Sequence, residues 1–312
     1  MRAFRLIPDD THIPFMQYQY WAYAFSGALV LLALILVPLK GLNFGIDFRG
    51  GILIEVRVPG EEADLGAMRA TLGGLALGEV ALQTFGAPND VLIRVQRQEG
   101  GEEAQQAAIS AVRSALDERF GEEISYRRVE FVGPKVSSEL LWAGTQAVLY
   151  SIIAILAYVW FRFEWQYAIG AIIALVHDTL TTIGMFALLG LEFNLASVAA
   201  LLTIVGYSLN DTVVIYDRVR ENLRKYKAMP MTELLDRSIN DTLARTVMTS
   251  GTTLLALLAL AIFGGPVIRG FVIAMIWGVL IGTFSTVYIA APILVHFHLR
   301  RTVQQTAATE TP

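Results

Sequence analysis

The chain has 312 residues, of which 54% are hydrophobic and only 17% are charged, with a formal net charge of -4. Soluble domains average about 25% charged residues, so the composition favours an integral membrane protein over a soluble enzyme. The absence of cysteine excludes disulfides and thiolate metal sites. The histidines form no H-x-x-x-H pair, and we expect no metal ion and no other cofactor.

The first long apolar run begins close to the N-terminus. Residues 13–39 carry no charge, and a membrane-spanning helix needs about 20 apolar residues. We therefore predict an N-terminal tail over 1–15 and a first transmembrane helix over 16–39. The run is too long for the core of a signal peptide and shows no small-residue cleavage site, so we expect it to stay in the protein.

Residues 40–139 are polar enough to form a soluble domain outside the membrane. Runs rich in β-branched residues alternate with helix-like segments. Their β-α-β-β-α-β order is that of a ferredoxin-like domain, which hosts many functions and assigns none by itself. The domain shows no metal cluster, nucleophile–base pair or aromatic–basic face, so we expect a packing or docking role and no nucleic-acid binding. The predicted elements are strand 51–58, helix 61–72, strands 79–85 and 90–96 joined by a "GAPN" turn, helix 101–121 and strand 124–132.

Residues 140–296 contain five further apolar runs of membrane-spanning length. We predict a five-helix transmembrane bundle in this part of the chain, with a cytoplasmic hairpin over 218–244 and a C-terminal tail over 297–312. The expected fold is an α-helical integral membrane protein with six transmembrane helices and a ferredoxin-like domain between the first and the second. The five runs cover 140–161, 165–191, 193–216, 246–268 and 270–295.

The distribution of Lys and Arg predicts how the helices are oriented. Loops on the cytoplasmic side of a membrane carry an excess of these residues. If the N-terminus is cytoplasmic, the short outer loops hold only Arg269. We therefore predict that both termini are cytoplasmic and that the soluble domain lies on the other side. The basic residues on the cytoplasmic side are then Arg2, Arg5, Arg162, Arg218, Arg220, Arg224, Lys225, Lys227, Arg237, Arg245, Arg300 and Arg301.

Asp178 and Asp211 lie inside the predicted membrane helices, and Arg245 directly precedes one of them. A charge in the middle of a bilayer costs about 2.5–3.5 kcal/mol on insertion scales, so each is expected to face the bundle interior and to have a partner. Counted from the inner ends of two antiparallel neighbouring helices, Asp211 and Arg245 lie at levels that differ by roughly 5 Å. An arginine side chain can span such a gap, so we expect these two residues to pair.

Two hypotheses explain this pair. It can be a static ion pair that fixes the helix register, although desolvation often offsets the attraction within such pairs. It can also be a proton relay, because burial disfavours an ionised carboxyl group while a nearby guanidinium favours it, and such groups build the relays of proton pumps. Asp178 is either a further relay member or a hydrogen-bonded polar group. His177 precedes it and is expected to point about 100° away around the helix.

Several stretches resemble the SecD/SecF family of bacterial protein-export membrane proteins. The motif "GIDFRGG" (45–51) follows the first span, and "GYSLNDTVVIYDRVREN" (206–222) contains the embedded aspartate. The resemblance covers nearly the whole chain, and one soluble insert with six spans favours the SecF branch over the longer SecD branch. The stretch "VGPKVSSEL" (132–140) departs from the family pattern at Ser137, where glycine is usual. Further matches are "LARTVMTSGTT" (243–253) and "FGGPVIRGF" (263–271).

The resemblance implies a role in protein export. Members belong to the RND superfamily. SecD and SecF, often with YajC, act with the SecYEG translocon and use the proton-motive force to help exported polypeptide leave on the outer side of the bacterial inner membrane. RND-type transporters have two six-helix halves, so a chain with one half is expected to need SecD as its partner. The family's proton site implies roles for Asp211 and Arg245, with Asp178 as an accessory. No enzymatic activity is expected.

The "GIDFRGG" motif also has a structural interpretation. Its glycines suit a tight turn that joins a helix to a strand. If the backbone there is extended, Asp47 and Arg49 share one face and can pair. We therefore interpret Gly45, Asp47, Arg49, Gly50 and Gly51 as a junction rather than a binding site.

Three other functions remain as alternatives. Asp178 and Asp211 could share a proton in an intramembrane aspartyl protease, but the chain has no G-x-G-D stretch. An RND-like proton-coupled exporter of lipid or small molecules would use the same proton site for another cargo. A purely structural scaffold of the translocon would not need the site at all.

Overall fold

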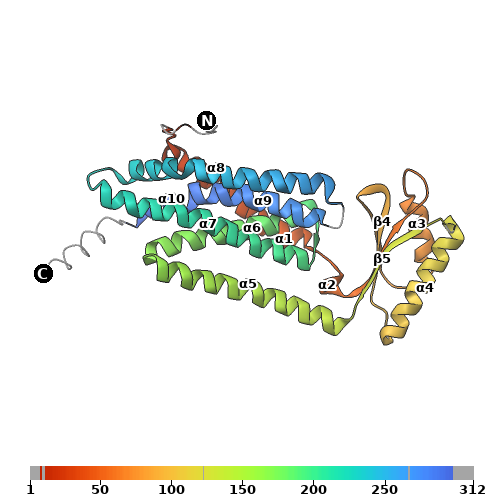
Figure 1. The fold of residues 1–312 in the computed structure, drawn as a ribbon. Coiled ribbons are helices and arrows are strands. Elements are labelled where there is room, and N and C mark those ends of the chain that lie inside the picture. The colour runs from red at the N-terminus through yellow and green to blue at the C-terminus, as the bar shows by residue number, and fades with distance from the viewer. Residues whose placement is uncertain (1–7, 9–10, 122, 266–267, 298–312) are drawn as a thin grey trace.

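Six helices long and apolar enough to cross a membrane form a bundle in the computed structural model, which describes residues 8, 11–121, 123–265 and 268–297. This number confirms the six expected spans, and a small α/β domain lies at one end of the bundle (Figure 1). Predictions for the two ends of the chain, including those for Arg2, Arg5, Arg300 and Arg301, lie outside the described residues. The spans are α1 (Gln19–Lys40) with the preceding turn Phe15–Tyr18, α5 (Pro134–Arg162), α6 (Trp165–Leu189), α7 (Leu195–Lys225), α8 (Met231–Phe263), and α9 (Arg269–Ser285), which continues through a π-helical turn (Thr286–Ala290) into α10 (Ala291–His296).

Three helices form the centre of the bundle. In their most apolar stretches, 56% of the residues of α6, 44% of α7 and 61% of the span that begins with α9 are buried, against 17% of α1, 6% of α5 and 17% of α8. Nearly the whole surface of α5 therefore faces outward, including Trp142, Tyr150 and Trp160. Exposed apolar surface of this extent marks contact with lipid or with another protein.

The helices α7 and α8 extend well beyond the membrane segments that the sequence predicts. The expected hairpin, 218–244, is helical on both sides of a short turn, because α7 ends at Lys225 and α8 begins at Met231. Leu234 and Leu235 in the first turns of α8 are completely buried. Tertiary packing thus stabilises these helical turns. A hydropathy count misses them because their outer faces are charged.

The soluble domain is a four-stranded antiparallel sheet covered on one face by two helices. The strand order is β3-β4-β2-β5, and every pairing in it is antiparallel, which is the ferredoxin-like order and agrees with the expected fold. Alternate residues of the central strands, such as Ile52, Ile54 and Ile93, are completely buried in the core under the helices. The elements are β2 (Gly51–Arg57), α3 (Leu65–Gly73), β3 (Val80–Phe85), β4 (Ala87–Val95), α4 (Gly101–Phe120) and β5 (Ser125–Val132).

Two local predictions in this domain are wrong. The "GAPN" stretch is not a four-residue turn, because β3 ends at Phe85, β4 begins at Ala87, and only Gly86 separates them. Gly86 has φ +84°, a backbone conformation that glycine adopts without strain. The helix α3 starts at Leu65 rather than at residue 61, because the Asp64 side chain caps it by accepting a hydrogen bond from a backbone N–H of the first turn.

Candidate functional site

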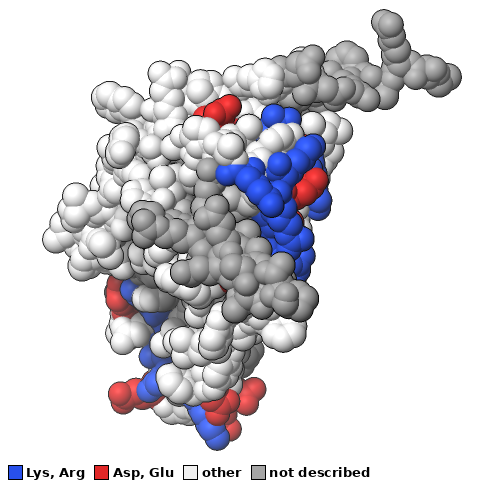
Figure 2. Space-filling model, turned by 90° about the vertical axis from the view of Figure 1, so that its left-hand side faces the viewer, with Lys and Arg blue, Asp and Glu red and all other residues white. Residues whose placement is uncertain are grey.

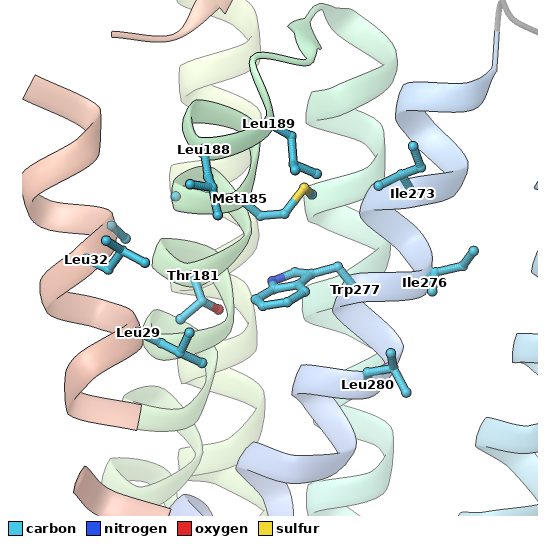
Figure 3. A pocket seen from close by; sticks show the side chains of 12 residues that line it. Leu29, Leu32, Thr181, Met185, Leu188, Leu189, Ile273, Ile276, Trp277 and Leu280 are labelled. Carbon is cyan, nitrogen blue, oxygen red and sulfur yellow. The ribbon is translucent and has the colours of Figure 1, made fainter. Parts of the chain in front are cut away.

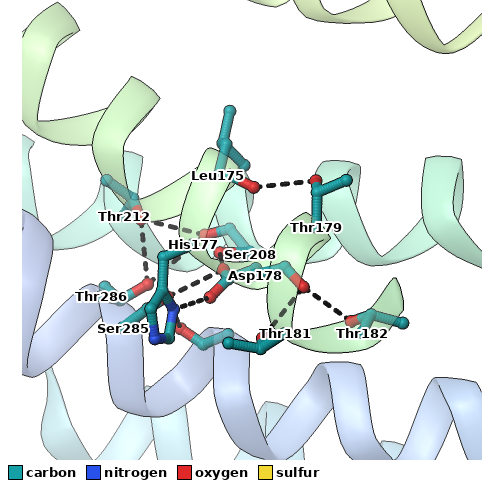
Figure 4. A network of polar contacts seen from close by, with 11 residues as sticks. Leu175, His177, Asp178, Thr179, Thr181, Thr182, Ser208, Thr212, Ser285 and Thr286 are labelled. Atoms are coloured by element: carbon teal, nitrogen blue, oxygen red, sulfur yellow. Dashed lines mark hydrogen bonds and ion pairs between the residues drawn. The ribbon is translucent and has the colours of Figure 1, made fainter. Parts of the chain in front are cut away.

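Asp178 lies near the middle of α6 and is completely buried. Its Oδ2 atom accepts hydrogen bonds from the hydroxyls of Ser208 on α7, at 2.6 Å, and Ser285 at the end of α9, at 2.8 Å. Its Oδ1 atom lies 3.0 Å from Nδ1 of His177. Figure 4 shows these groups converging on the carboxylate. Both oxygens of Asp178 are therefore engaged, and the residue ties α6, α7 and α9 together.

The contact between His177 and Asp178 differs from the expectation that the two side chains point apart. Successive side chains leave a helix about 100° apart, but two neighbours can still meet when both bend along the helix surface. The imidazole takes this course and is only 5% exposed, and its Nε2 atom is buried without a hydrogen-bond partner among the described residues. Sequence reasoning left His177 out of the site, although two adjacent polar residues in an apolar helix were the available signal.

A π-helical turn (Thr286–Ala290) directly follows Ser285. The hydroxyl of Thr286 lies 2.9 Å from that of Thr212, which extends the polar network along α7. Pro292 follows this turn and has no N–H with which to close a regular helical hydrogen bond. Turns of this kind are frequent at functional sites, and this one lies beside the buried carboxylate.

Asp211 lies on α7, about one turn beyond Ser208, and only 7% of its surface is exposed. Its Oδ1 atom accepts a hydrogen bond from the hydroxyl of Thr246 on α8 at 2.7 Å. Its Oδ2 atom is buried and has no hydrogen-bond partner in the described part of the chain. A buried oxygen that accepts no hydrogen bond costs free energy. A proton on Oδ2, or a donor group from outside the chain, would remove this cost.

The expected ion pair between Asp211 and Arg245 is not formed within this chain. The two residues lie on neighbouring helices, as the depth argument predicts, but Arg245 is exposed and Thr246 takes the place beside the carboxylate. Depth along a helix does not fix the direction in which a side chain leaves it, and one residue changes that direction by about 100°. Arg245 still lies close enough for its charge to act on Asp211.

The two buried aspartates do not share a hydrogen bond. The donors of Asp178 are on α6, α7 and α9, whereas the donor of Asp211 is on α8. An aspartyl protease requires two carboxyl groups that share a proton, so the geometry gives this alternative no support.

A row of hydroxyl groups continues from Asp211 toward the soluble domain. The hydroxyl of Ser250 lies 2.8 Å from that of Thr283 and 3.4 Å from that of Tyr207. Ser250 and Tyr207 stand about one helical turn from Thr246 and Asp211 respectively. These groups offer hydrogen bonds to water along the line where α7, α8 and α9 meet.

The "GIDFRGG" motif lies where the soluble domain meets the bundle. Its middle forms a short helix, α2 (Ile46–Arg49), so Asp47 and Arg49 do not share the face of an extended chain and do not pair. Instead, Oδ2 of Asp47 accepts a hydrogen bond at 2.9 Å from the backbone N–H of Leu195, the first residue of α7. Gly51 has φ +115°, and a Cβ there would lie 2.6 Å from a carbonyl oxygen of β4. The motif thus sets the start of α7 and the first strand of the sheet at one place.

A second set of contacts joins the domain to the bundle. Strand β1 (Asn43–Phe44) pairs in parallel with β6 (Glu192–Phe193). Arg94 of β4 donates to Oδ1 of Asn43 at 2.8 Å and to Oε2 of Glu192 at 2.6 Å. The sheet is therefore held against the connection between α6 and α7, so a movement of α7 would be transmitted to the domain.

A cavity of about 250 Å³ lies between α1, α6 and α9, and neither buried aspartate lines it. Figure 3 shows Trp277 of α9 facing Leu29 of α1 and Thr181 of α6. The remaining walls are hydrophobic, which suits apolar groups rather than ions. Among the residues that the structure describes, no group of three His, Asp or Glu side chains could hold a metal ion.

Comparison with known proteins gives the relatives of this chain. The family model "Protein export membrane protein SecD/SecF, C-terminal" matches residues 112–300, and the model "SecD/SecF GG Motif" matches residues 35–58. "Protein translocase subunit SecF" of Rickettsia rickettsii is 47% identical over 297 residues, which cover 95% of this chain and 96% of that protein. "Protein translocase subunit SecF" of Rhodobacter capsulatus is 46% identical, over an alignment that covers 96% of this chain and 93% of that protein.

Two solved structures resemble the whole fold. The crystal structure of SecDF, a translocon-associated membrane protein from Thermus thermophilus, matches 94% of this chain with a TM-score of 0.83 and 36% identity. This chain spans only 39% of that longer chain. A crystal structure of SecDF in a super-membrane-facing form matches 96% of this chain with a TM-score of 0.67 and 34% identity, and this chain spans 40% of it.

Proposed function

The chain belongs to the SecF branch of the SecD/SecF family of protein-export membrane proteins, and we propose that it couples proton movement through Asp211 to protein export. It is a multi-pass membrane protein and a subunit of the export machinery. The observation that carries the proposed coupling is the state of Asp211, which is buried, hydrogen-bonded through one oxygen and open at the other.

The open oxygen gives Asp211 two alternative partners. A charge in a bilayer costs about 2.5–3.5 kcal/mol or more, and Thr246 supplies only one hydrogen bond to offset this cost. A proton on Oδ2 removes the charge, and a guanidinium beside Oδ2 compensates it. Proton transfer follows when the two alternate: the approach of Arg245 releases the proton, and its withdrawal lets Asp211 bind another.

Arg245 is suited to this alternation because no hydrogen bond or ion pair within the described part of the chain holds its side chain in one position. The side chain is also exposed. We propose that SecD supplies a second six-helix half that packs on the bundle and brings its own groups to Oδ2. Two observations support such a second half: only 6% of the most apolar stretch of α5 is buried within this chain, and the similar SecDF chain is much longer. Asp178 serves as an accessory that holds the central helices around the site.

The proposed orientation places both termini in the cytoplasm of a bacterium and the soluble domain in the periplasm, across the inner membrane. Basic residues near the end of α7, Arg220, Arg224 and Lys225, line a surface depression with Arg162. Figure 2, which views the end of the bundle opposite the soluble domain, shows Lys and Arg gathered in one strip. An excess of Lys and Arg is typical of the cytoplasmic side.

The proposed partners beyond SecD are the SecYEG translocon, YajC and the exported polypeptide. The soluble domain is placed to pass motion to such a chain, because Asp47 and Arg94 join it to the start of α7 and to the connection before it. A proton cycle at Asp211, on the same helix, can then move the domain.

The test uses bacterial cells depleted of their own copy of the protein. Export of a signal-bearing precursor is compared for wild-type chain and Asp211→Asn at equal membrane abundance, with co-purification of SecD as a check on assembly. Asparagine keeps the shape of the side chain and removes its titration. The matched control is Asp217→Asn, since Asp217 lies on the same helix but is exposed and paired with Arg162 at 2.9 Å.

We expect Asp211→Asn to slow export by about tenfold or more, because acid–base groups commonly contribute factors of at least this size, and Asp217→Asn to export normally. Unchanged export by an assembled Asp211→Asn complex would reduce the residue to a structural role. An RND-like exporter of lipid or small molecules would lose transport of its own cargo without accumulation of precursor.

A further inference from the structure

A second polar site in the bundle points to a proton-binding pair next to α1. We propose that His177 and Asp178 bind one proton between them, which enters and leaves at Nε2 of His177 through water held between α6 and Ser26 of α1. The inference rests on the proposed function only in assigning this pair to the same proton-coupled cycle.

The surroundings of Asp178 fit a carboxylate. Two serine hydroxyls donate to its Oδ2 atom, and Nδ1 of His177 lies 3.0 Å from its Oδ1 atom. An ionised carboxyl group accepts through both oxygens, whereas a protonated one must donate one hydrogen bond. The contacts are met by a carboxylate that accepts from the Nδ1–H of the imidazole, and also by a protonated carboxyl group that donates to Nδ1. We take the first arrangement for the pair before it binds a further proton. Nε2 of His177 then carries a lone pair.

Nε2 is the atom at which this pair can change its charge. Without a further proton the pair has a net charge of about −1 in the bundle interior, which is costly there. A proton on Nε2 gives an imidazolium beside a carboxylate, which is neutral as a whole. Two groups in such contact titrate as a unit. Nε2 is buried without a partner among the described residues, so it is the open position of the pair.

The helix α1 carries a buried hydroxyl group at the level of this nitrogen. α1 and α6 run in the same direction, because the strands that follow them, β1 and β6, pair in parallel. A Cβ at Gly184 would collide with Ala33, so these residues mark a close approach of the two helices. Ser26 lies seven residues before Ala33, and His177 lies seven residues before Gly184. Seven residues are about two helical turns, so Ser26 and His177 are at the same level. Ser26 is only 7% exposed, and its hydroxyl is also buried without a partner in the described chain.

A second buried hydroxyl group indicates from which side water reaches Nε2 of His177. The hydroxyl of Tyr23, about one turn from Ser26 on the side away from the soluble domain, is buried and has no partner among the described residues. Buried polar groups nearly always bind protein or water, and a buried water makes about three hydrogen bonds. On the other side, the apolar cavity of Figure 3 begins about one turn away, at Leu29 and Thr181. Water therefore reaches Nε2 along Tyr23 and Ser26.

Few other titratable groups surround the pair. The contact on α7 is Ser208, and Asp211 one turn further is bound to α8. The end of α9 and the π turn contribute hydroxyl groups. Residues 13–39 before and along α1, 140–161 of α5 and 270–295 of the last span carry no charge. Tyr23 is the titratable side chain that α1 adds on this side. The contact of His177 with Asp178 and the water at Ser26 therefore control the protonation of the pair.

The proposed step moves only a proton. Water at Ser26 passes a proton to Nε2 of His177 and takes another from water beside Tyr23, so that no hydroxide is left, while the Nδ1–H stays hydrogen-bonded to Asp178. On release the proton returns from Nε2 to water, and the hydroxyls of Ser208 and Ser285 keep their bonds to the carboxylate throughout.

The test is nitrogen-15 NMR of the full chain in lipid bilayers, co-purified with SecD and labelled at histidine. The signals of His177 are assigned by their loss in His177→Gln and followed from pH 5 to pH 9, a range about the ordinary titration of histidine. We expect Nδ1 to carry hydrogen throughout and Nε2 to gain hydrogen as the pH falls. Ser26→Ala should move the Nε2 signal, whereas Tyr207→Phe, which also removes a membrane hydroxyl, should not. Asp178→Asn removes the carboxylate beside the ring and should lower the share of Nε2 that carries hydrogen relative to wild type.

Two results would overturn the inference. One is an Nε2 that carries hydrogen at every pH, and the other is a signal and titration that Ser26→Ala leaves unchanged. Both are read from wild-type chain and a mild variant, so they do not depend on the folding of Asp178→Asn. The outcome is separate from the export test: a silent His177 with export still lost in Asp211→Asn would remove this inference and keep the proposed function.

Discussion

The two buried aspartates of the bundle meet α7 about one turn apart, Asp178 through Ser208 and Asp211 as a residue of that helix, yet their surroundings are opposite. Asp178 is completely buried and has donors from three helices on both oxygens. Asp211 has one donor, Thr246, and one oxygen that meets no partner within the described chain. The comparison teaches that burial alone does not define how a carboxyl group works. Asp178 keeps its bonds to protein donors, so its site can change charge only at Nε2 of His177, whereas Asp211 has an oxygen of its own that meets no partner among the described residues.

Among the variants that test this contrast, Arg245→Gln should have the largest effect on export. If Arg245 acts on the open side of Asp211, its loss should slow export about as strongly as Asp211→Asn, by roughly tenfold or more. The unfolding free energy of the chain should change by less than about 0.5 kcal/mol, because the exposed side chain makes no hydrogen bond or ion pair within the described part of the chain. Arg245→Lys keeps the charge and should retain part of the activity. Normal export with a destabilised Arg245→Gln chain would instead identify a structural arginine.

Stability should separate the two aspartates in the other direction. Asp178→Ala removes three hydrogen bonds, two of which join α6 to α7 and α9. Hydrogen bonds between membrane helices contribute about 0.6 kcal/mol on average and up to about 1.7 kcal/mol each. We expect a loss of about 2–4 kcal/mol of unfolding free energy on this basis, against about 1 kcal/mol or less for Asp211→Ala. Denaturant unfolding in lipid bicelles measures both. Equal losses would contradict the contrast between a closed and an open site.

Ser285→Ala sharpens the same contrast with a smaller change. It deletes one donor to Asp178 at 2.8 Å and should cost about 1 kcal/mol. Export should then fall only as far as the lower amount of folded protein requires. Ser110→Ala on the exposed face of α4 is the control, since its hydroxyl bonds only to its own helix. A loss of export beyond the loss of folded protein would give Ser285 a direct part in transport.

The smallest expected effect concerns a carboxylate outside the membrane. Hydrogen bonds from Arg57, at 2.6 Å to each oxygen, hold the pKa of Asp90 below its usual value. Because the folded pKa is depressed, this contribution to stability is present above the unfolded pKa of about 3.9 and is lost as the pH falls through the folded pKa. Arg57 is 40% exposed, so screening by solvent keeps this contribution small.

Acid unfolding of the domain within the full chain measures the effect of Asp90. Wild-type protein should lose stability below about pH 4, and Asp90→Asn should flatten this part of the curve. A variant that keeps the full acid dependence would show that other carboxyl groups dominate it.

How much the sequence predicts differs between these sites. Hydropathy alone singles out Asp178 and Asp211, because a charge inside an apolar run is visible in one dimension, and it places Arg245 at the edge of another such run. The alternation of strands and helices likewise predicts the ferredoxin-like order. The sequence does not predict the hydrogen-bond partners of these charged residues. Ser285 reaches Asp178 from more than a hundred positions away, and only the packing of α9 against α6 and α7 reveals it.

The wrong details share one cause, which is that sequence gives position along an element but not direction around it. Arg245 lies at the expected depth, yet Thr246 points at Asp211. His177 should point away from Asp178, yet the two side chains bend together. Asp47 should pair with Arg49, yet the backbone there is helical and Asp47 binds the start of α7 instead.

The measurement that tests the central claim most directly is proton flux through the purified complex. The chain and SecD are reconstituted together in vesicles that contain a pH-sensitive dye, and a pH gradient is imposed. Wild-type complex should show proton entry above that of empty vesicles, Asp217→Asn should match it, and Asp211→Asn should reduce it to the empty-vesicle level. Equal proton flux through wild type and an intact Asp211→Asn complex would contradict the account.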